Sequence, residues 1–583
     1  MRHTKIVCTI GPASENIQTL KEMIQSGMTV ARLNFSHGSH EEHENRIKLV
    51  RQAAKEVGRI VAIMLDTKGP EIRTGLIEGD KITLSEGNSI ILTAEQVMGT
   101  PEKISVTYEG IHKDVEPGNK ILLDDGLIEL LVKKVVGTEV HCEILNGGEL
   151  SNRKGVNIPG VHVNLPAITE KDVKDIVFGI EQEVDFIAAS FIRAASDVLE
   201  IRRILEEHEA DIHIISKIEN QAGVSNIDEI LAVSDGIMVA RGDLGVEIPS
   251  EEVPLVQKTL IEKCNKAGKP VITATQMLDS MIRNPRPTRA EANDVANAIF
   301  DGSDAVMLSG ETAAGKYPVQ SVKTMARIAE RTETALKYEE ILGKKEMLPQ
   351  KTVTDAISYA TCNIALELDA AAIITPTASG FTARMVSKYK PKAKIIAATP
   401  YLKVAKKMCL VWAVHPVLVR KTDGTDEMIT EGVQRTLEAG LISLGDLVVI
   451  TAGVPVGVPG TTNLLKVHIV GEIVARGTGI GNRIVTGKIR KVSSGEEAVS
   501  KISHGDILVT HGTDKEYVPA MEKAVAIITE EGGITSHAAV VGISINVPVI
   551  VGCEDAMKVL DENSTVTIDA ARGIVYRGVT KAL

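Results

Sequence analysis

Charged and polar side chains recur where short runs of β-branched residues end. Arg32, Asn34 and Ser36 alternate in VARLNFSHG, and Lys217 and Glu219 alternate in SKIEN. Residues two apart in an extended strand project to the same side. Each run therefore presents its polar groups together, with two cations and a carboxylate among them. Such a set suits a strongly anionic substrate, and phosphoryl transfer needs mainly positioning and neutralisation of charge.

A metal site is the second expectation for these run ends. Glu219 and Asp243 follow neighbouring runs, so their carboxylates would converge on a hard divalent ion such as Mg²⁺, which prefers oxygen ligands. Asp66 and Thr67 close another run, and Thr275 closes a further one. The alternative is that these charges only form salt bridges between strand ends. Several polar ends in one fold favour a functional site.

The elements that would carry these residues are strand-like runs, each followed by an amphipathic helical stretch. This alternation is typical of an α/β fold, and eight such units close a (β/α)₈ TIM barrel, whose chemistry lies at the C-terminal ends of the strands. An open doubly wound sheet is the alternative architecture. The eight runs are KIVCTI, VARLNF, VAIMLDT, DFIAASF, IHIISKI, GIMVARGD, VITATQM and AVMLSGE.

The pattern divides the chain into four regions. The barrel is expected over 1–69 and 167–343, and an insertion over 70–166 has strand runs and glycine turns that predict a small β-barrel lid domain at the catalytic end. A charged linker leads to an α/β effector and oligomerisation domain over 344–471. The last region, 472–583, is predicted to be an additional β/α domain.

Composition narrows the function classes for this chain of 583 residues. A formal net charge of −12 and 3% aromatic residues argue against nucleic-acid binding. Nothing resembles a transmembrane segment, and the first residues lack the pattern of a signal peptide, so we expect a cytoplasmic protein with no membrane partner. The six cysteines are scattered singly, which predicts neither a disulfide framework nor a zinc site.

Long motifs resemble those of the pyruvate kinase family, of bacterial type, over residues 1 to about 471. They are TKIVCTIGPAS, ARLNFSHG, LDTKGPEIRTG, KGVNIPG, ISKIEN, MVARGDLGVE, TATQMLDSM, PTRAEANDVANA and DAVMLSGETAAGKYP. The resemblance implies direct, in-line transfer of the phosphoryl group of phosphoenolpyruvate to ADP at the barrel mouth. The products would be pyruvate and ATP, in the last step of glycolysis, and the assembly would be a homotetramer.

The resemblance also assigns roles to residues at the barrel mouth. Glu219 and Asp243 match the ligands of a Mg²⁺ ion. Lys217 matches the residue that stabilises charge on the transferring phosphoryl group and on the enolate, and Arg32 matches the residue that grips the phosphate. Thr275 matches the position of the group that, with water, protonates the enolate carbon.

Further contacts are implied for the rest of the substrates. Backbone N–H groups of Gly242 and Asp243, at the head of a helical turn, would hold the carboxylate of phosphoenolpyruvate. Residues of the barrel and of the insertion match contacts to the nucleotide, ADP or ATP: Arg32, His37, Arg73 and Lys154.

A monovalent cation is implied as well, so Mg²⁺ and K⁺ are the expected cofactors. Glu71 in GPEIRTG matches family members that require K⁺, whereas K⁺-independent members tend to carry lysine there. The residues that match the K⁺ ligands are Asn34, Ser36, Asp66 and Thr67.

In the third region TPTASGFTAR resembles a loop that binds the phosphate of an effector, and its small residues leave N–H groups free for an anion. An ordinary turn is the alternative. The later loop AGVPVGVPGTTNLLKV lacks the Trp and Arg with which some relatives hold fructose 1,6-bisphosphate, so we expect a sugar monophosphate or nucleotide monophosphate. The effector-binding residues would be Thr377, Ser379, Gly380 and Thr382.

In the last region GGITSHAAVVGISINVPVIVG resembles the swivelling phosphohistidine domain of enzymes that use phosphoenolpyruvate, and His537 matches their phosphorylated histidine. Val541 and Gly542 stand where those enzymes usually have Ala-Arg. Because direct transfer at the barrel would suffice, we expect His537 to be structural. Two alternatives stay open: a phosphoenolpyruvate-dependent phosphohistidine carrier acting through His537, and a non-catalytic regulatory protein on the same fold.

Overall fold

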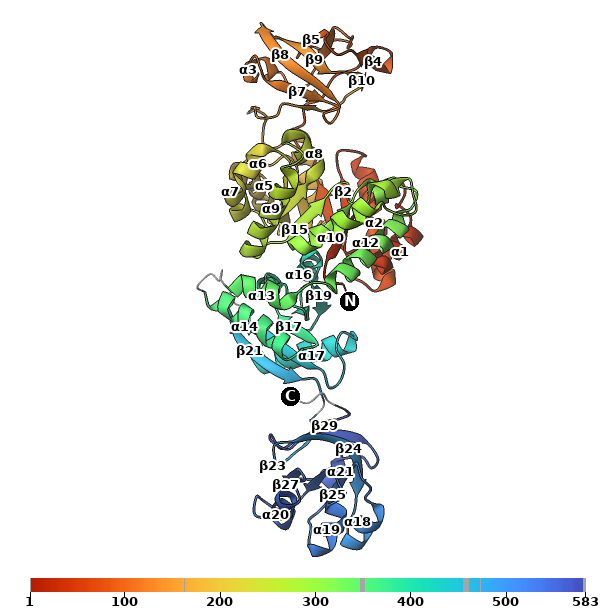
Figure 1. Ribbon diagram of the computed structural model, residues 1–583, viewed down its shortest axis with the longest axis vertical. Coiled ribbons are helices and arrows are strands. Elements are labelled where there is room, and N and C mark those ends of the chain that lie inside the picture. Colours follow the sequence, from red (N-terminus) through yellow and green to blue (C-terminus); the bar gives the residue numbers. More distant parts are fainter. Residues whose placement is uncertain (1, 162, 347–351, 455–460, 472, 580–583) are drawn as a thin grey trace. The chain divides into compact units, whose positions relative to one another are not determined.

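Eight parallel strands close a barrel, as the sequence predicts (Figure 1). A computed structural model of the chain describes residues 2–161, 163–346, 352–454, 461–471 and 473–579. The strand order around the barrel is β1-β16-β15-β14-β13-β12-β3-β2. These strands are β1 (Lys5–Thr9), β2 (Val30–Asn34), β3 (Ala62–Asp66), β12 (Phe186–Ala189), β13 (His213–Ile218), β14 (Gly236–Ala240), β15 (Val271–Ala274) and β16 (Ala305–Leu308).

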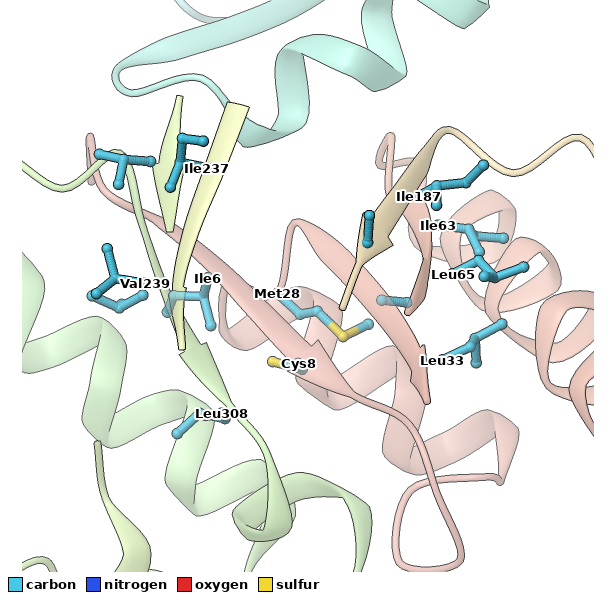
Figure 2. Packing of buried hydrophobic residues seen from close by; sticks show 14 of the residues in the cluster. Ile6, Cys8, Met28, Leu33, Ile63, Leu65, Ile187, Ile237, Val239 and Leu308 are labelled. Atoms are coloured by element: carbon cyan, nitrogen blue, oxygen red, sulfur yellow. The ribbon is translucent and has the colours of Figure 1, made fainter. Parts of the chain in front are cut away.

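Alternate residues along the barrel strands belong to two different cores. Val7, Met64 and Ile215 belong to a buried cluster to which every barrel strand contributes, which is the barrel interior. Ile6 and Cys8 belong to a second cluster that the strands share with the surrounding helices (Figure 2). Because successive side chains of a strand point to opposite faces, both faces of each strand are buried. This is why the predicted runs are almost continuously apolar.

Helices follow the strands and pack on the outside of the barrel. Several begin with a capping box, in which the N-cap hydroxyl and the N3 carboxylate each accept from the other residue's backbone N–H. Ser39 and Glu42 form one at α2, and Thr169 and Asp172 form one at α4. The helices are α1 (Ile17–Ser26), α2 (His40–Val57), α4 (Glu170–Glu181), α5 (Ala195–Glu207), α6 (Gln221–Ser225), α7 (Ile227–Val233), α8 (Arg241–Glu247), α9 (Val253–Ala267), η2 (Asp279–Ile282), α10 (Arg289–Asp301), α11 (Gly310–Ala313), α12 (Pro318–Glu333) and α13 (Tyr338–Glu346).

The insertion consists mainly of strands around its own apolar core, which includes Ile90, Leu130 and Cys142. Its main sheet has the order β11-β7-β8-β9-β5-β6, and β4 pairs with β10 in a separate sheet. Its elements are η1 (Glu78–Asp80), β4 (Lys81–Leu84), β5 (Ser89–Thr93), β6 (Lys103–Ser105), α3 (Ile111–Asp114), β7 (Lys120–Leu123), β8 (Ile128–Val136), β9 (Glu139–Asn146), β10 (Gly148–Ser151) and β11 (Val156–Asn157).

A segment from much later in the chain closes the N-terminal end of the barrel. The short helix η3 (Met408–Leu410) contributes side chains to the barrel interior. Lys5 Nζ, at the start of β1, donates to Val414 O over 2.5 Å. Two segments of the third region, Ala383–Lys390 and Tyr401–Pro416, form one compact unit with the barrel and the insertion.

The third region contains a five-stranded sheet with the order β19-β18-β17-β20-β21, in which β20 and β21 are antiparallel. Ile374, Ile396 and Val448 lie in its core. Its elements are α14 (Val353–Glu367), β17 (Ala372–Pro376), α15 (Phe381–Ser387), β18 (Lys394–Thr399), α16 (Leu402–Lys407), β19 (Val414–Leu418), α17 (Thr425–Glu438), β20 (Leu447–Gly453) and β21 (Thr462–Ile469).

The last region is a mixed sheet with the order β22-β29-β28-β24-β25-β26-β27-β23 and two apolar clusters. Throughout the described ranges, no helix has both the length and the apolar character needed to cross a bilayer. The elements of the last region are β22 (Ile473–Arg476), β23 (Thr478–Ile480), β24 (Ile484–Lys491), α18 (Gly495–Lys501), β25 (Asp506–Thr510), η4 (Lys515–Tyr517), α19 (Val518–Met521), β26 (Ala526–Thr529), α20 (His537–Ser544), β27 (Val549–Val551), α21 (Ala556–Val559), β28 (Thr565–Asp569) and β29 (Ile574–Arg577).

Candidate active site

Lys217 lies at the centre of a buried polar cluster at the C-terminal ends of β3, β12 and β13. Its Nζ is 3.0 Å from Glu219 Oε1, 3.1 Å from Asp66 Oδ1 and 2.7 Å from Ser190 Oγ. All four side chains are buried. Because three adjacent parallel strands end here, residues far apart in sequence meet at one point. Charge interactions at such a site are screened much less than at the surface.

Arg32 extends this cluster toward β1. Its Nε is 2.5 Å from Asp66 Oδ2, and its Nη1 donates to Thr9 Oγ1 over 2.9 Å. Asp66 therefore lies between two cations, because its other oxygen contacts Lys217. The structure thus brings together the two cations that the sequence places at separate strand ends.

Burial and neighbouring charges act in opposite directions on these groups. Burial lowers the pKa of Lys217, but the carboxylates of Asp66 and Glu219 outweigh burial, so the net shift is upward and the ammonium stays charged. Burial raises the pKa of Asp66, yet Arg32 and Lys217 bring it below its usual range. At Glu219 burial dominates and, together with the nearby Asp243 carboxylate, raises the pKa to about 7.

Glu219 and Asp243 have the electrostatics of a site for a divalent cation. Two effects disfavour ionisation of Glu219: its own burial and the negative charge of Asp243. A positive ion bound between the two carboxylates would therefore stabilise their charged forms. Within the described part of the chain, no three His, Cys, Asp or Glu side chains are arranged to hold a metal. A Mg²⁺ ion held by these two carboxylates would take its other ligands from water and substrate oxygens, as Mg²⁺ commonly does.

Strand β14 ends at Ala240, and α8 begins at the next residue. Gly242 and Asp243 therefore lie in the first turn of α8. Gly242 N donates to Thr275 Oγ1 over 2.8 Å, and Thr275 directly follows β15 with a φ of 66°. Arg241 holds this arrangement in place: it donates to Thr275 O over 2.8 Å and forms a two-pronged ion pair with Asp294. The structure therefore joins the predicted carboxylate-binding turn to Thr275.

The predicted K⁺ ligands occupy two adjacent strand ends. Asn34 on β2 and Asp66 on β3 are register partners. Asn34 Oδ1 accepts from Ser36 N over 3.1 Å, and Thr67 Oγ1 accepts from Ser190 N over 3.1 Å. Hydroxyl, amide and carboxylate oxygens are donors that suit a hard cation.

A cavity of about 500 Å³ lies between the barrel mouth and the insertion. Arg73 and Lys154 line it from the insertion, and Asp243 lines it from the barrel. Glu71 also lines it, and its carboxylate is 2.7 Å from Arg73 Nε. His37 lies outside the described lining of this cavity, in the turn after β2, where its carbonyl accepts from a neighbouring histidine.

Sequence reasoning missed Thr9, Ser190 and Phe191. Ser190 directly follows β12 just as Thr67 directly follows β3, so the same signal would have found it. Its Oγ accepts from Lys217 and donates to Thr67 O over 2.6 Å. Phe191 contributes only its backbone: it has a φ of 56°, and its N–H donates to Glu219 Oε2 over 2.7 Å. No pattern of side-chain types in the sequence indicates that a backbone N–H donates to a carboxylate of the candidate site.

Models of known protein families match most of the chain. "Pyruvate kinase, barrel domain" matches residues 1–322, and "Pyruvate kinase, alpha/beta domain" matches residues 355–468. The chain belongs to the pyruvate kinase family. "PEP-utilising enzyme, mobile domain" matches residues 502–573. Similar proteins include the pyruvate kinases of Geobacillus stearothermophilus, Bacillus licheniformis and Staphylococcus aureus (strain USA300), which are 60%, 58% and 55% identical, with 100% of both chains covered.

The loop that resembles an effector site in the pyruvate kinase family follows β17. Gly380 N donates to Thr377 Oγ1 over 2.9 Å, and Gly380 has a φ of 78°. Thr382 Oγ1 is 2.9 Å from Thr462 Oγ1 on β21, and Ser379 is half-buried. The structure brings Thr377 and Gly380 together. In the later loop that the sequence singles out, residues 455–460 lie outside the described residues.

His537 is the first residue of α20 in the region that matches the mobile domain. Its Nδ1 is 2.9 Å from Thr513 Oγ1. Gly542 stands where phosphohistidine domains usually carry arginine, and a Cβ added there would lie 2.2 Å from Val549 Cγ2. The close packing of α20 on β27 therefore leaves no room for the arginine side chain.

Proposed function

We propose that the chain is a cytoplasmic pyruvate kinase. The bond between phosphorus and the enol oxygen of phosphoenolpyruvate breaks, and a bond between phosphorus and a β-phosphate oxygen of ADP forms, which gives ATP and the enolate of pyruvate. The observation that carries the proposal is the buried ammonium of Lys217 beside Glu219 and Asp66, in a chain 60% identical to a pyruvate kinase.

Lys217 and Arg32 supply the positive charge for the transfer. Both sit in one buried cluster, so the oxygens of the phosphoryl group would approach fixed charges that need no reorganisation during the reaction. The raised pKa of Lys217 keeps its ammonium charged at neutral pH. It can therefore stabilise both the phosphoryl group and the enolate oxygen.

Two metal ions are part of this proposal. Glu219 and Asp243 would hold Mg²⁺, which when bound supplies charge neutralisation at the phosphoryl and enolate oxygens. Asn34, Ser36, Asp66 and Thr67 would hold K⁺ through their oxygen atoms. Glu71 would mark the K⁺ requirement.

Thr275 would position the proton donor, with water, for the enolate carbon. The N–H groups of Gly242 and Asp243 would hold the substrate carboxylate. Gly242 N donates to Thr275 Oγ1 in the structure, so a bound carboxylate would take over or share that N–H and would lie next to the threonine hydroxyl. That contact would aim the enolate toward its proton donor.

The nucleotide, the effector and the assembly complete the proposal. ADP would lie in the cavity under the insertion, and an effector phosphate would bind the loop after β17, in a homotetramer. The nucleotide contacts would be Arg73 and Lys154, which line the cavity, and Arg32 and His37, which lie outside its described lining. The effector contacts would be Thr377, Ser379, Gly380 and Thr382.

The test is pyruvate formation from phosphoenolpyruvate and ADP, with Mg²⁺ and K⁺ each omitted in turn. We expect turnover only with both ions present. A folded protein that forms no pyruvate under any of these conditions would show that the barrel has another function.

A further inference from the structure

One buried carboxylate bonds both points at which the insertion joins the barrel. The chain leaves the barrel after Gly69 and returns at Thr169. Asp172 Oδ1 accepts from Gly69 N over 3.0 Å, while its Oδ2 accepts from Thr169 N over 2.9 Å and from Thr169 Oγ1 over 2.6 Å. Asp172 is 0% exposed, so water does not compete for these bonds.

The bond to Gly69 goes beyond what the helix cap needs. A capping box at the start of α4 uses only the bonds between Asp172 and Thr169. Gly69 is 103 residues away in sequence, and its N–H brings the other end of the insertion to the same carboxylate. Bonds of a buried carboxylate to N–H and O–H donors are short and strong, so both ends are firmly held.

Gly69 also rests directly on the catalytic cluster. Its φ is +73°, and a Cβ added to it would lie 2.8 Å from Phe191 Cδ2 and 2.9 Å from Ser190 Cβ. Phe191 N donates to Glu219, and Ser190 Oγ accepts from Lys217. The point that Asp172 holds is therefore in contact with residues that hold the reacting groups.

Arg193 of the barrel also bonds the returning connection, at Leu165 O over 2.9 Å. One contact farther out on the insertion is of a different kind. Asn157 on β11 donates from Nδ2 to Glu247 Oε1 on α8 over 2.8 Å, and both side chains are partly exposed. Such a bond can exchange with water when the insertion moves away. The bonds at Asp172 lie where the insertion joins the barrel. When the insertion moves relative to the barrel, atoms at this junction are displaced least.

We propose that Asp172 is a positioning residue for nucleotide use: it fixes both ends of the insertion against the barrel and so sets where Arg73 and Lys154 lie over the cavity. This role rests on the proposed function for its kinetic readout, but not for its structural one. The phosphoenolpyruvate contacts lie on the barrel strands, so the effect should fall mainly on ADP.

The experiment compares Asp172→Asn and Thr169→Val with wild type in the full-length protein. The asparagine has a single acceptor oxygen, so it can no longer accept at both connections at once. The valine removes both hydrogen bonds of the Thr169 hydroxyl, to Asp172 Oδ2 and from Asp172 N. The matched control is Glu291→Gln. Glu291 is likewise the N3 residue of a capping box, at α10, and accepts from Ser280 N, Ser280 Oγ and Thr288 N.

We expect kcat/KM for ADP to fall about tenfold in Asp172→Asn and less in Thr169→Val, with KM for phosphoenolpyruvate within about twofold of wild type. Hydrogen exchange should quicken about tenfold at one or both connections in Asp172→Asn, and at the peptides that span Thr169 in Thr169→Val, with no change at either connection in Glu291→Gln. The control should lower only the melting temperature.

Two results would overturn the proposal. One is a folded Asp172→Asn protein with wild-type ADP kinetics and wild-type exchange at both connections. The other is an equal loss for ADP and phosphoenolpyruvate that Glu291→Gln reproduces, which would make Asp172 an ordinary helix cap. If wild type itself forms no pyruvate, the proposed function fails, and exchange at the two connections still decides whether Asp172 holds them.

Discussion

Lys217 is the residue at which the charges of the barrel mouth meet, since it contacts Asp66, Glu219 and Ser190 at once. Arg32 shares Asp66 with it. In this arrangement each cation is held by groups that do not react, so its position is fixed before substrate arrives. Preorganised charge of this kind is the main resource of an enzyme that transfers phosphoryl groups.

Lys217→Met tests this at the scale of one side chain. Methionine keeps the length of the side chain and removes the ammonium, so kcat for pyruvate formation should fall about a thousandfold. The change leaves Glu219 without its cation and Asp66 with Arg32 alone, and should cost about 3–5 kcal/mol of stability, so melting must be followed alongside. Lys263→Met, at a surface pair with Asp228, is the control and should keep full activity. A folded Lys217→Met enzyme with more than a tenth of wild-type turnover would contradict the assigned role.

The proposed K⁺ requirement would depend on another single residue, Glu71. In Glu71→Lys the new ammonium would replace the charge of K⁺, so we expect K⁺ to stimulate turnover less than about twofold, whereas wild type should depend on it strongly. Glu71→Gln removes the ion pair with Arg73 without adding a cation and should keep the K⁺ dependence. Initial rates against K⁺ concentration decide this, and a lysine variant as K⁺-dependent as wild type would disprove it.

Single residues also show how far sequence reasoning reached. Polar residues at the ends of apolar runs predicted Lys217, Asp66 and Arg32, because the parallel strands carry their ends to one place. Phe191 escaped because it acts through a backbone N–H, whose direction depends on a positive φ that no side-chain type indicates. Asp172 reads from sequence only as a helix cap, since its bond to Gly69 spans 103 residues.

At the scale of elements, the connection at Gly69 has a strict requirement for glycine. Alanine at a positive φ costs roughly 1–2 kcal/mol by itself. Gly58, with a φ of 67° and nothing within 4 Å of an added Cβ, is the matched position for that cost alone. Gly69→Ala must in addition displace Phe191 or Ser190, so it should lose about 1–3 kcal/mol more and also lower kcat. Melting and turnover of the two variants measure this, and equal losses would show that the contact is harmless.

Strand β1 carries a buried lysine whose titration should be visible. Burial lowers the pKa of Lys5 to about 8, while an unfolded lysine titrates near 10.5. Between these values the unfolded chain binds more protons, so the free energy of unfolding rises with pH by up to roughly 3 kcal/mol. Below pH 8 both states hold the proton and this gain is absent.

Lys5→Met should remove that gain. The difference in melting temperature between wild type and variant should therefore shift in favour of wild type between pH 8 and pH 10. Lys48→Met, at an exposed pair with Glu44, should show no such shift. A difference that stays constant over this range would mean that Lys5 keeps its proton in the folded protein.

The strands of the barrel were predictable, because local apolar runs fix them, and all eight are confirmed. The segment Tyr401–Pro416 was not, since its packing at the barrel floor depends on contacts distant in sequence and on no local pattern. The run GIMVARGD extends to Asp243, whereas β14 ends at Ala240, and Asp243 lies in the helical turn that the family resemblance implies. After β14 ends, the chain turns into α8, where Gly242 N donates to Thr275 Oγ1 over 2.8 Å.

At the scale of the whole molecule, the last region raises the question of a second phosphoryl site. In the proposed function the cluster around Lys217 serves direct transfer, and Gly542 lacks space for the arginine of phosphohistidine domains. We therefore expect His537→Ala to keep kcat within about twofold of wild type. Wild type incubated with labelled phosphoenolpyruvate but no ADP should retain no label. Label that stays on wild type and is lost in His537→Ala, but not in Thr513→Val, would establish a carrier.

The late segment that closes the N-terminal end of the barrel has a consequence for folding during translation. Lys5 bonds to Val414, 409 residues later, and η3 fills the interior that β1 helps to line. At about 5–20 residues per second, the first strand waits roughly 20 to 80 s before the segment that covers its lower end has been made. During that time an apolar opening faces the solvent, so we expect the nascent barrel to bind chaperones until more than two thirds of the chain has been translated.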